Sequence, residues 1–211
     1  MLEVVEIFRS IQGESTWAGT PCTFVRLAGC NLDCAYCDTQ YARVGGQTRE
    51  LDDVATEALR TPDPIVEITG GEPLLQPDAI PLARRLADAD RTVLVETNGT
   101  VLLPVERDFR AIMDWKTPGS GHPDSFDREN LVRLRAGDEV KFVLCDRRDY
   151  DWAVSRLSEL PGNEGVPILF GAAKDRLSPA LLADWILEDH LPVRLNVQLH
   201  TFLWPNATRA V

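Results

Sequence analysis

Three cysteines lie within one short stretch of the chain, at Cys30, Cys34 and Cys37. A loop with this spacing lets three thiolates converge on one metal centre from different directions. Three thiolates are one short of the four ligands that close a structural metal site. We therefore expect an iron-sulfur centre with one iron left open, where a bound molecule can react.

A zinc site is the alternative reading of the same spacing. Zinc would take a fourth ligand from Cys22, Cys145 or a histidine. The histidines lie far from the three cysteines in the sequence and form no paired metal motif; they are His122, His190 and His200. Without a spacing partner, Cys22 and Cys145 are most simply buried small hydrophobic residues.

A second motif, Thr69-Gly70-Gly71-Glu72-Pro73, directly follows an apolar run that predicts a strand. Two further polar runs, 96–100 and 114–117, end other predicted strands. Parallel sheets place their functional loops at the carboxyl ends of the strands. We therefore expect these three runs to lie near one another.

The elements that must position these motifs alternate between strands and helices. Helix candidates are 51–59, 152–160 and the segments around Leu82 and Leu181, while 119–123 looks like a loop. Such alternation implies βαβ units and a parallel sheet. The predicted strands are 4–8, 24–27, 65–69, 93–97, 111–114, 140–144, 168–170 and 193–199.

The length of the chain limits the kind of sheet it can form. A complete eight-stranded barrel needs about 250 residues. With 211 residues we expect one domain over 1–211. Its fold should be an incomplete (β/α) barrel of about six parallel strands with truncated helical cover.

Composition excludes several classes of partner. The formal charge of −11 gives no attraction to nucleic acid or to an anionic membrane. No run approaches the roughly 18 apolar residues of a membrane span, and residues 1–8 alternate acidic and apolar types, unlike a signal peptide. We expect a cytoplasmic protein with a small substrate, and a reducing cytosol favours metal binding over disulfides for clustered cysteines.

The cysteine spacing, with Tyr36 before the last cysteine, and the Gly-Gly-Glu motif together resemble the radical S-adenosylmethionine (SAM) superfamily. The resemblance implies a [4Fe-4S] cluster in a loop at about 28–48, whose open iron binds SAM. One electron from the cluster then cleaves SAM to a 5′-deoxyadenosyl radical. The SAM-binding residues that the resemblance implies are Tyr36, Cys37, Asp38, Gly70, Gly71, Glu72, Asn98, Asp114, Trp115, Lys116, Phe170 and Gly171.

Other segments are similar to one family within that superfamily, the 7-carboxy-7-deazaguanine synthases. They are 7–14, 19–39, 96–100, 191–194 and 198–205, and the similarity is weakest between about 117 and 165. Members of this family convert 6-carboxy-5,6,7,8-tetrahydropterin to 7-carboxy-7-deazaguanine with release of ammonia, on the route to queuosine in tRNA and related 7-deazapurines. The resemblance implies a carbon-nitrogen lyase that uses SAM catalytically and also takes Mg²⁺.

The same resemblance assigns a substrate site. Arg26 would bind the substrate carboxylate, because its planar guanidinium can donate two parallel hydrogen bonds to a carboxylate. The alternative is that Arg26 is a surface charge at the end of a strand. Thr39 would supply a hydroxyl ligand to Mg²⁺. Without the resemblance, Asp38-Thr39 would be interpreted as a turn. His200 would lie at the substrate or cap the last strand. The implied substrate-binding residues are Ile11, Gln12, Gly13, Glu14, Arg26, Thr69 and His200.

The chain departs from the family pattern at several positions. Ser15 stands where glycine is usual, Thr201 where lysine is common, and Asp114-Trp115 where the family often has Ser-Pro. Some members close the pterin site with their terminal carboxylate. Here that position aligns near Asn206 and five more residues follow, so we do not expect that contact.

Partners and competing functions complete the expectations. An electron donor such as flavodoxin or ferredoxin should reduce the cluster, and the open side of an incomplete barrel makes a homodimer reasonable.

A second hypothesis for the function is an activase that installs a glycyl radical on a large partner enzyme. That function would leave Gln12-Gly13-Glu14 and Arg26 without a role. A third is a zinc-stabilised binding module without catalysis, which would be colourless rather than brown.

Overall fold

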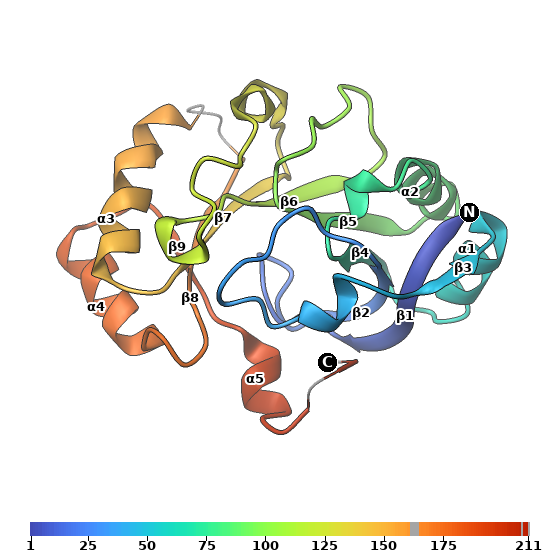
Figure 1. Ribbon diagram of the computed structural model, residues 1–211, viewed down its shortest axis with the longest axis horizontal. Coiled ribbons are helices and arrows are strands. Elements are labelled where there is room, and N and C mark those ends of the chain that lie inside the picture. Colours follow the sequence, from blue (N-terminus) through green and yellow to red (C-terminus); the bar gives the residue numbers. More distant parts are fainter. Residues whose placement is uncertain (161–164, 208, 211) are drawn as a thin grey trace.

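Nine strands form one continuous sheet in the computed structural model, which describes residues 1–160, 165–207 and 209–210. They are β1 (Leu2–Ile11), β2 (Pro21–Leu27), β3 (Gln47–Arg49), β4 (Ile65–Gly70), β5 (Thr92–Thr97), β6 (Arg110–Asp114), β7 (Glu139–Leu144), β8 (Ile168–Ala172) and β9 (Arg194–Asn196). Across the sheet their order is β3-β1-β2-β4-β5-β6-β7-β8-β9. The sheet curves, so that β1 and β8 lie on opposite sides of the molecule (Figure 1).

Most of this sheet is parallel. β2 and the strands from β4 to β9 pair in parallel, whereas β1 pairs antiparallel with both β2 and β3. The expected incomplete (β/α) barrel is confirmed, with seven parallel strands in the described chain rather than about six. Sequence patterns did not predict β3, because its three residues, Gln47-Thr48-Arg49, are all polar.

Helices cover the outer face of the sheet. They are α1 (Leu51–Ala58), α2 (Ala79–Ala87), α3 (Arg147–Arg156) and α4 (Pro179–Glu188), whereas a short α5 (Leu199–Leu203) lies apart from them. α1 and α2 pack on β1, β2, β4 and β5, and α3 and α4 pack on β7, β8 and β9 (Figure 1). The helix expected at 152–160 begins earlier, because the Asp146 side chain accepts from the Asp149 amide at 3.0 Å and so caps α3. It ends at Arg156, where a 3-10 turn, Leu157–Glu159, follows.

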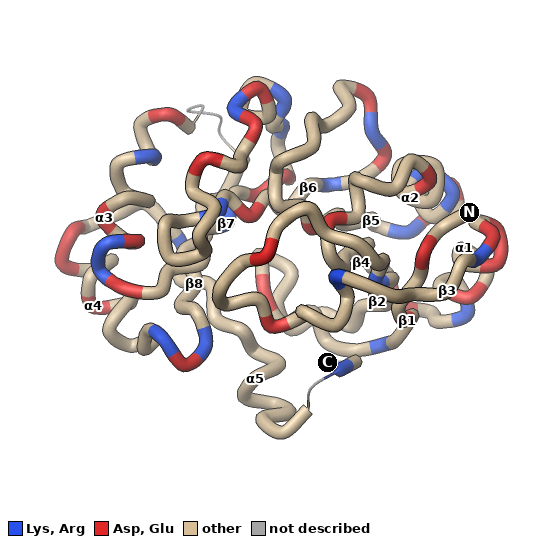
Figure 2. The backbone as a smooth tube through the Cα atoms, in the orientation of Figure 1, with Lys and Arg blue, Asp and Glu red and all other residues tan. Residues whose placement is uncertain are grey.

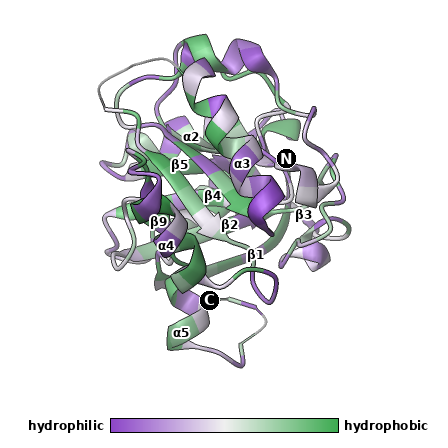
Figure 3. Cartoon of the chain, turned by 90° about the vertical axis from the view of Figure 1, so that its left-hand side faces the viewer, coloured by the Kyte–Doolittle hydropathy of each residue, from purple (hydrophilic) through white to green (hydrophobic). Residues whose placement is uncertain are grey.

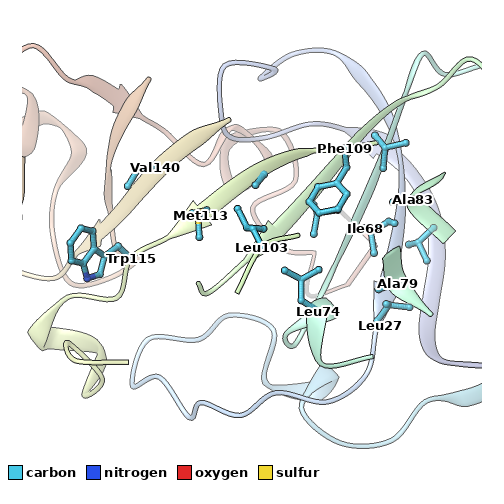
Figure 4. Close-up of a cluster of buried hydrophobic side chains, with 14 of the residues drawn as sticks. Leu27, Ile68, Leu74, Ala79, Ala83, Leu103, Phe109, Met113, Trp115 and Val140 are labelled. Atoms are coloured by element: carbon cyan, nitrogen blue, oxygen red, sulfur yellow. The ribbon is translucent and has the colours of Figure 1, made fainter. Parts of the chain in front are cut away.

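The main core lies between the sheet and these helices. Strand residues that point outward, such as Ile68, Met113 and Val140, are fully buried there. Figure 4 shows part of this core, where Leu27 and Ile68 approach Ala79 and Ala83 of α2. In Figure 3 the central strands are green, and hydrophilic residues in purple colour much of the outer helices and loops. Such burial is the main favourable contribution to the stability of a domain of this size.

The expected strand at 193–199 is shorter in the structure. β9 ends at Asn196, and α5 begins at Leu199. The Leu199 amide donates to the Gly13 carbonyl at 2.8 Å, so the chain turns toward the segment after β1 instead of continuing beside β8. The expected loop at 119–123 starts as a 3-10 turn, Pro118–Ser120, and leaves it at Gly121 with a left-handed φ of 91°.

In the described part of the chain, no helix combines the length and the apolar character that crossing a membrane requires. Acidic and basic residues are interspersed over the outer helices and loops (Figure 2).

Candidate active site

A cavity of about 520 Å³ opens where the parallel strands end. Side chains alternate along each strand, so every second residue points inward. Near the amino ends of the strands the inward residues form a small apolar cluster of Cys22, Phe24, Ile65, Leu94 and Ile112. Further along the same strands, and on β7, the inward residues are charged or polar and line the cavity; they are Arg26, Glu67, Thr69, Glu96, Asp114 and Lys141. The polar residues therefore gather at the carboxyl edge of the sheet, as the strand-end motifs predicted.

Most of the predicted site residues line this cavity. All three cysteines, Thr39 and the seven predicted substrate residues do so. Of the predicted SAM residues, those that line it are Tyr36, Cys37, Asp38, Gly70, Gly71, Asn98, Asp114 and Lys116. Four predicted SAM residues do not line it, namely Glu72, Trp115, Phe170 and Gly171.

Strand alternation explains why Trp115 and Phe170 lie elsewhere. Trp115 follows the inward-facing Asp114 and so points outward, where it stacks on Phe126 at 4.4 Å between ring centroids. Phe170 points outward as well and packs edge-on against Phe142 at 5.6 Å. Both belong to the core beneath the helices, so we leave them out of the site. Gly171 is enclosed by the pairing of β8 with β9, and a Cβ there would meet the Asn196 carbonyl at 3.3 Å.

Hydrogen bonds from several directions hold the cysteine loop, which runs between β2 and β3. At its start, the Gly29 amide donates to the Ala42 carbonyl at 2.9 Å. Between the second and third cysteines, the Ala35 amide donates to the Ser120 carbonyl at 3.0 Å, and Arg176 donates to the Ala35 carbonyl at 3.1 Å. These bonds anchor the loop to the β6–β7 and β8–α4 connections, so two separate segments help to position the thiols.

The three thiols fit a cluster better than a single ion. All five cysteines are free, and Cys30, Cys34 and Cys37 are half-buried at the cavity. Among the described residues, no three His, Cys, Asp or Glu side chains converge closely enough to hold one metal ion. A zinc ion would need its sulfur ligands at about 2.3 Å from one point. Three half-buried thiols that line one cavity suit an iron-sulfur cluster, for which soft sulfur ligands are the usual donors.

The two glycines of the Gly-Gly-Glu motif let its backbone pass very close to the cysteine loop. A Cβ at Gly70 would lie 2.0 Å from the Leu27 carbonyl oxygen, and one at Gly71 would lie 2.0 Å from the Gly29 carbonyl oxygen. Gly70 also has a φ of 136°, which favours glycine. No side chain fits at either position, so this close approach accounts for both glycines before any ligand is considered.

Glu72 is fully buried and faces the end of β5 rather than the cavity. Its carboxylate accepts hydrogen bonds from the Thr97 hydroxyl at 2.8 Å, the Asn98 amide at 2.6 Å and the Leu74 amide at 3.0 Å. Burial raises the pKa of Glu72, although these hydrogen bonds oppose the shift. Glu72 therefore fixes the position of Asn98, which does line the cavity.

Among the residues that the structure describes, two buried polar atoms beside the cavity have no hydrogen-bond partner. They are the Tyr36 hydroxyl and Asp114 Oδ1, whereas Asp114 Oδ2 accepts from the Lys116 ammonium at 2.7 Å. Burial alone would lower the pKa of Lys116, but Asp114 outweighs it and keeps the ammonium charged. Buried polar groups are rarely left unsatisfied. The two orphaned atoms therefore fit a polar ligand such as SAM in this part of the cavity.

On the opposite side, Gln12 and Arg26 present polar groups to the cavity. The Gln12 carboxamide donates to Glu67 and accepts from the Glu14 amide at 2.5 Å, which sets its orientation. Arg26 Nε donates to Glu6 at 2.9 Å, and the Tyr41 hydroxyl donates to the same Glu6 oxygen at 2.8 Å. Among the described residues, nothing pairs with the two terminal nitrogens of Arg26. This guanidinium is therefore available to an anionic group in the cavity.

Thr39 and Asp38 supply oxygen atoms at the cavity, and the Thr39 hydroxyl donates to Asp38 at 2.7 Å. Oxygen donors of this kind fit Mg²⁺, which binds few protein ligands and keeps several waters. His200 lies in α5, against Gly13, where a Cβ would meet its Nδ1 at 2.4 Å. Glycine at position 13 thus makes room for His200 beside the cavity.

The segment after α5 reaches the mouth of the cavity. Trp204, Ala207 and Arg209 line it, and the Arg209 guanidinium lies 4.4 Å from the centroid of the Tyr41 ring. Asn206 does not line it. The terminal carboxylate, for which we expected no contact, lies outside the described residues.

Two buried strand charges at the cavity, Glu67 on β4 and Lys141 on β7, were not among the predicted site residues. Glu96 on β5 was included only as the first residue of the polar run 96–100. A usable signal was present, because each charge interrupts a buried apolar strand, as in Val66-Glu67-Ile68 and Val140-Lys141-Phe142. Parallel strands buried on both faces are otherwise almost continuously hydrophobic. Arg26 shows the same pattern, between Val25 and Leu27.

The chain is similar to known proteins in both sequence and fold. Residues 25–153 match the Radical SAM superfamily. Over its whole length the chain is 42% identical to the 7-carboxy-7-deazaguanine synthase of Koribacter versatilis, covering 100% of both chains. It is 43% identical to that of Chlorobaculum tepidum, covering 100% of this chain and 97% of the other. The crystal structure of QueE from Escherichia coli has the same fold, with a TM-score of 0.77, 24% identity and coverage of 94% of each chain.

Proposed function

This chain belongs to the 7-carboxy-7-deazaguanine synthase family of the radical SAM superfamily, and on that premise we propose how its cavity carries out the family reaction. The reaction converts 6-carboxy-5,6,7,8-tetrahydropterin to 7-carboxy-7-deazaguanine and releases ammonia, so the protein is a carbon-nitrogen lyase. The observation that carries the proposal is that the three cysteines, Gln12, Glu14, Arg26 and Thr39 all line one cavity.

Cys30, Cys34 and Cys37 would hold a [4Fe-4S] cluster, and Tyr36, Asn98, Asp114 and Lys116 would surround SAM beside it. When bound, the cluster and SAM supply a carbon-centred radical after a one-electron reduction. The protein itself positions the groups that surround SAM. The buried Glu72 carboxylate fixes the Thr97-Asn98 turn, and the Lys116–Asp114 pair provides charge and hydrogen-bonding capacity where SAM would lie.

The pterin would lie between the cysteine loop and the segment after β1. Gln12 and Glu14 would bond the nitrogen-rich edge of its ring, and Arg26 would bind its carboxylate with the two terminal nitrogens that Glu6 leaves free. Ile11, Gly13, Thr69 and His200 would complete the lining. Thr39, with Asp38 beside it, would give Mg²⁺ an oxygen ligand near the same carboxylate. Holding reactants in this way lowers the entropic part of the barrier.

We also propose that residues 1–211 form one domain, with the cluster loop at about 28–48. One sheet contains all the described strands, and one core cluster extends from Leu2 to Ile186. The protein would act in the cytoplasm, where free thiols persist, and would receive electrons from a small carrier such as flavodoxin or ferredoxin.

A homodimer is proposed on separate grounds. Apolar side chains are exposed on the edge strand β9 and in and directly after α5; they are Leu195, Phe202, Leu203 and Trp204. Exposed apolar patches next to a sheet edge commonly mark an interface. Light scattering should give twice the chain mass, and Phe202→Glu should shift the protein toward the monomer. A wild-type protein that stays monomeric at tens of micromolar would contradict the dimer.

An anaerobic assay tests the function. Protein reconstituted with iron and sulfide should convert the carboxytetrahydropterin in the presence of SAM, a reductant and Mg²⁺, and the ultraviolet absorbance of the deazapurine product should report it. Protein that cleaves SAM but never converts the pterin would refute the substrate. Cys34→Ala serves as the control, because it should lose the cluster and the activity while remaining folded. A zinc-stabilised module would instead unfold.

A further inference from the structure

Lys141 is a buried cation in the middle of β7 that none of the assignments above uses. Its side chain is 4% exposed, and its neighbours Val140 and Phe142 point into the core on the other face of the strand. A lysine in such a strand loses most of its hydration, which is costly unless the charge is paired. Its contacts therefore indicate what it is for.

The Lys141 ammonium joins residues from separate parts of the cavity wall. It donates to Glu14 Oε2 at 2.8 Å, in the segment after β1, and to Glu96 Oε1 on β5. Asp114 Oδ2 on β6 lies 3.9 Å away but has Lys116 as its nearer partner, at 2.7 Å. Glu14 also accepts from Asn196 at 3.2 Å and from Gln198 at 3.0 Å, which links the group to the last strand.

The charges of this group are set by these contacts. Burial alone would lower the pKa of Lys141, but Glu14 and Glu96 hold it well above its usual range. Burial alone would raise the pKa of Glu14, but Lys141 lowers it to about 2. Glu14 is thus an anion and Lys141 a cation at neutral pH, and Lys141 reduces the repulsion between Glu14 and Glu96, the two carboxylates it bridges.

We propose that Lys141 is a positioning residue that holds the Glu14 and Glu96 carboxylates in place to receive the N–H groups of the substrate ring. This inference rests on the proposed function, because it takes a pterin as the ligand. Lys141 bonds one oxygen of Glu96, and in the described part of the chain the other oxygen accepts only from the Thr69 hydroxyl, at 3.5 Å. A fixed carboxylate oxygen facing the cavity suits the adjacent N–H donors of a 2-amino-4-oxopyrimidine ring. Without Lys141 the two carboxylates would repel each other and the substrate carboxylate.

Ligand binding to the cluster-loaded enzyme, measured without reductant, tests this role. Equilibrium dialysis would give the Kd of the carboxytetrahydropterin and, separately, the Kd of SAM. Lys141→Met should weaken pterin binding by at least about tenfold and change SAM binding by less than about threefold. Lys141→Arg keeps the charge and should restore part of the pterin affinity. Loss of both affinities by the same factor would mean a merely structural role and would overturn the proposal, as would unchanged pterin affinity.

A double-mutant cycle identifies the partner through which Lys141 acts. Glu96→Gln and Lys141→Met should each weaken pterin binding, and the combined variant should lose clearly less than the product of the two factors. Independent effects that multiply would refute the positioning role. If Lys141→Met does not fold, the cycle of Lys141→Arg with Glu96→Gln gives the same test. Wild-type enzyme that fails to bind the pterin would refute the proposed function, whereas wild-type binding with an unaffected Lys141 variant refutes only this inference.

Discussion

The backbone amide of Glu72 donates a 2.7 Å hydrogen bond to the carbonyl oxygen of Gly29, the residue before the first cysteine. Gly29 and Glu72 are 43 positions apart in the chain, yet this bond joins the cysteine loop directly to the Gly-Gly-Glu motif. The Gly71 amide adds a 3.2 Å bond to the Leu27 carbonyl. The motif thus shapes the cysteine loop as well as lining the cavity.

Gly71→Ala should damage the cluster loop. The new Cβ would lie 2.0 Å from the Gly29 carbonyl oxygen, which is backbone and cannot rotate away. We expect a loss of about 1–3 kcal/mol in the free energy of unfolding and less iron per chain after reconstitution. Gly19→Ala is the control, because it adds a methyl group at another glycine, with a φ of 91° but nothing within 4 Å. Equal effects of the two substitutions would show that the close approach is unimportant.

Glu72→Ala should be among the most destabilising single changes. It removes a carboxylate that accepts three hydrogen bonds and leaves the Thr97 hydroxyl and two buried amides without an acceptor. Each unsatisfied group costs about 1–3 kcal/mol, so we expect at least about 3 kcal/mol in urea unfolding. Thr97→Val removes only one of these donors and should cost about 1 kcal/mol. A loss below 1 kcal/mol for Glu72→Ala would contradict this account.

The Glu14–Lys141 pair predicts a loss of stability in acid. The pKa of Glu14 is lowered to about 2 in the folded protein, against an ordinary value near 4.3. A lowered carboxyl pKa gives stability that is present above the unfolded value and is lost as the pH falls through the folded one. The contribution is on the order of 3 kcal/mol and should disappear between about pH 5 and pH 2. Urea unfolding at several pH values measures it, and in Glu14→Gln this part of the pH dependence should be absent.

Glu67 predicts the opposite dependence. Burial, followed by the nearby Glu96 carboxylate, raises its pKa well above the ordinary value. A raised carboxyl pKa gives stability that is complete below the unfolded value and is lost as the pH rises through the folded one. Glu67→Gln should therefore gain stability relative to wild type as the pH rises from about 5 to 8. A stability difference that is constant over this range would show that Glu67 is ionised like an ordinary carboxylate.

Arg26→Lys should weaken binding of the carboxytetrahydropterin by about tenfold or more, because a lysine cannot form two parallel bonds to a carboxylate. The same variant should bind a tetrahydropterin without the 6-carboxylate as well as wild type does. That matched ligand separates recognition of the carboxylate from general damage to the cavity. Equal weakening for both ligands would mean that Arg26 acts through Glu6 and Tyr41 rather than on the substrate.

The motif residues could be predicted from the sequence, because residue types and their spacing within one short segment are enough to identify them. Three cysteines in one loop, and two glycines before a glutamate, indicate their chemistry without any knowledge of the tertiary structure. The strands were open to prediction as well, because a parallel sheet buried on both faces leaves long apolar runs. Trp115 and Phe170 do not line the cavity, because side chains of adjacent residues on a strand point to opposite faces of the sheet. A shift of one residue moves a side chain to the other face.

The sequence by itself therefore determined the chemistry: a three-thiolate loop with an open position, a glycine motif after a strand, and an arginine within an apolar run. Tertiary structure decided which distant residues share the cavity. Lys141 meets Glu14, 127 positions away, only because β7 and the segment after β1 face each other across the curved sheet. Ion pairs between strands depend on register and curvature, and these follow from the packing of the whole core rather than from any local pattern.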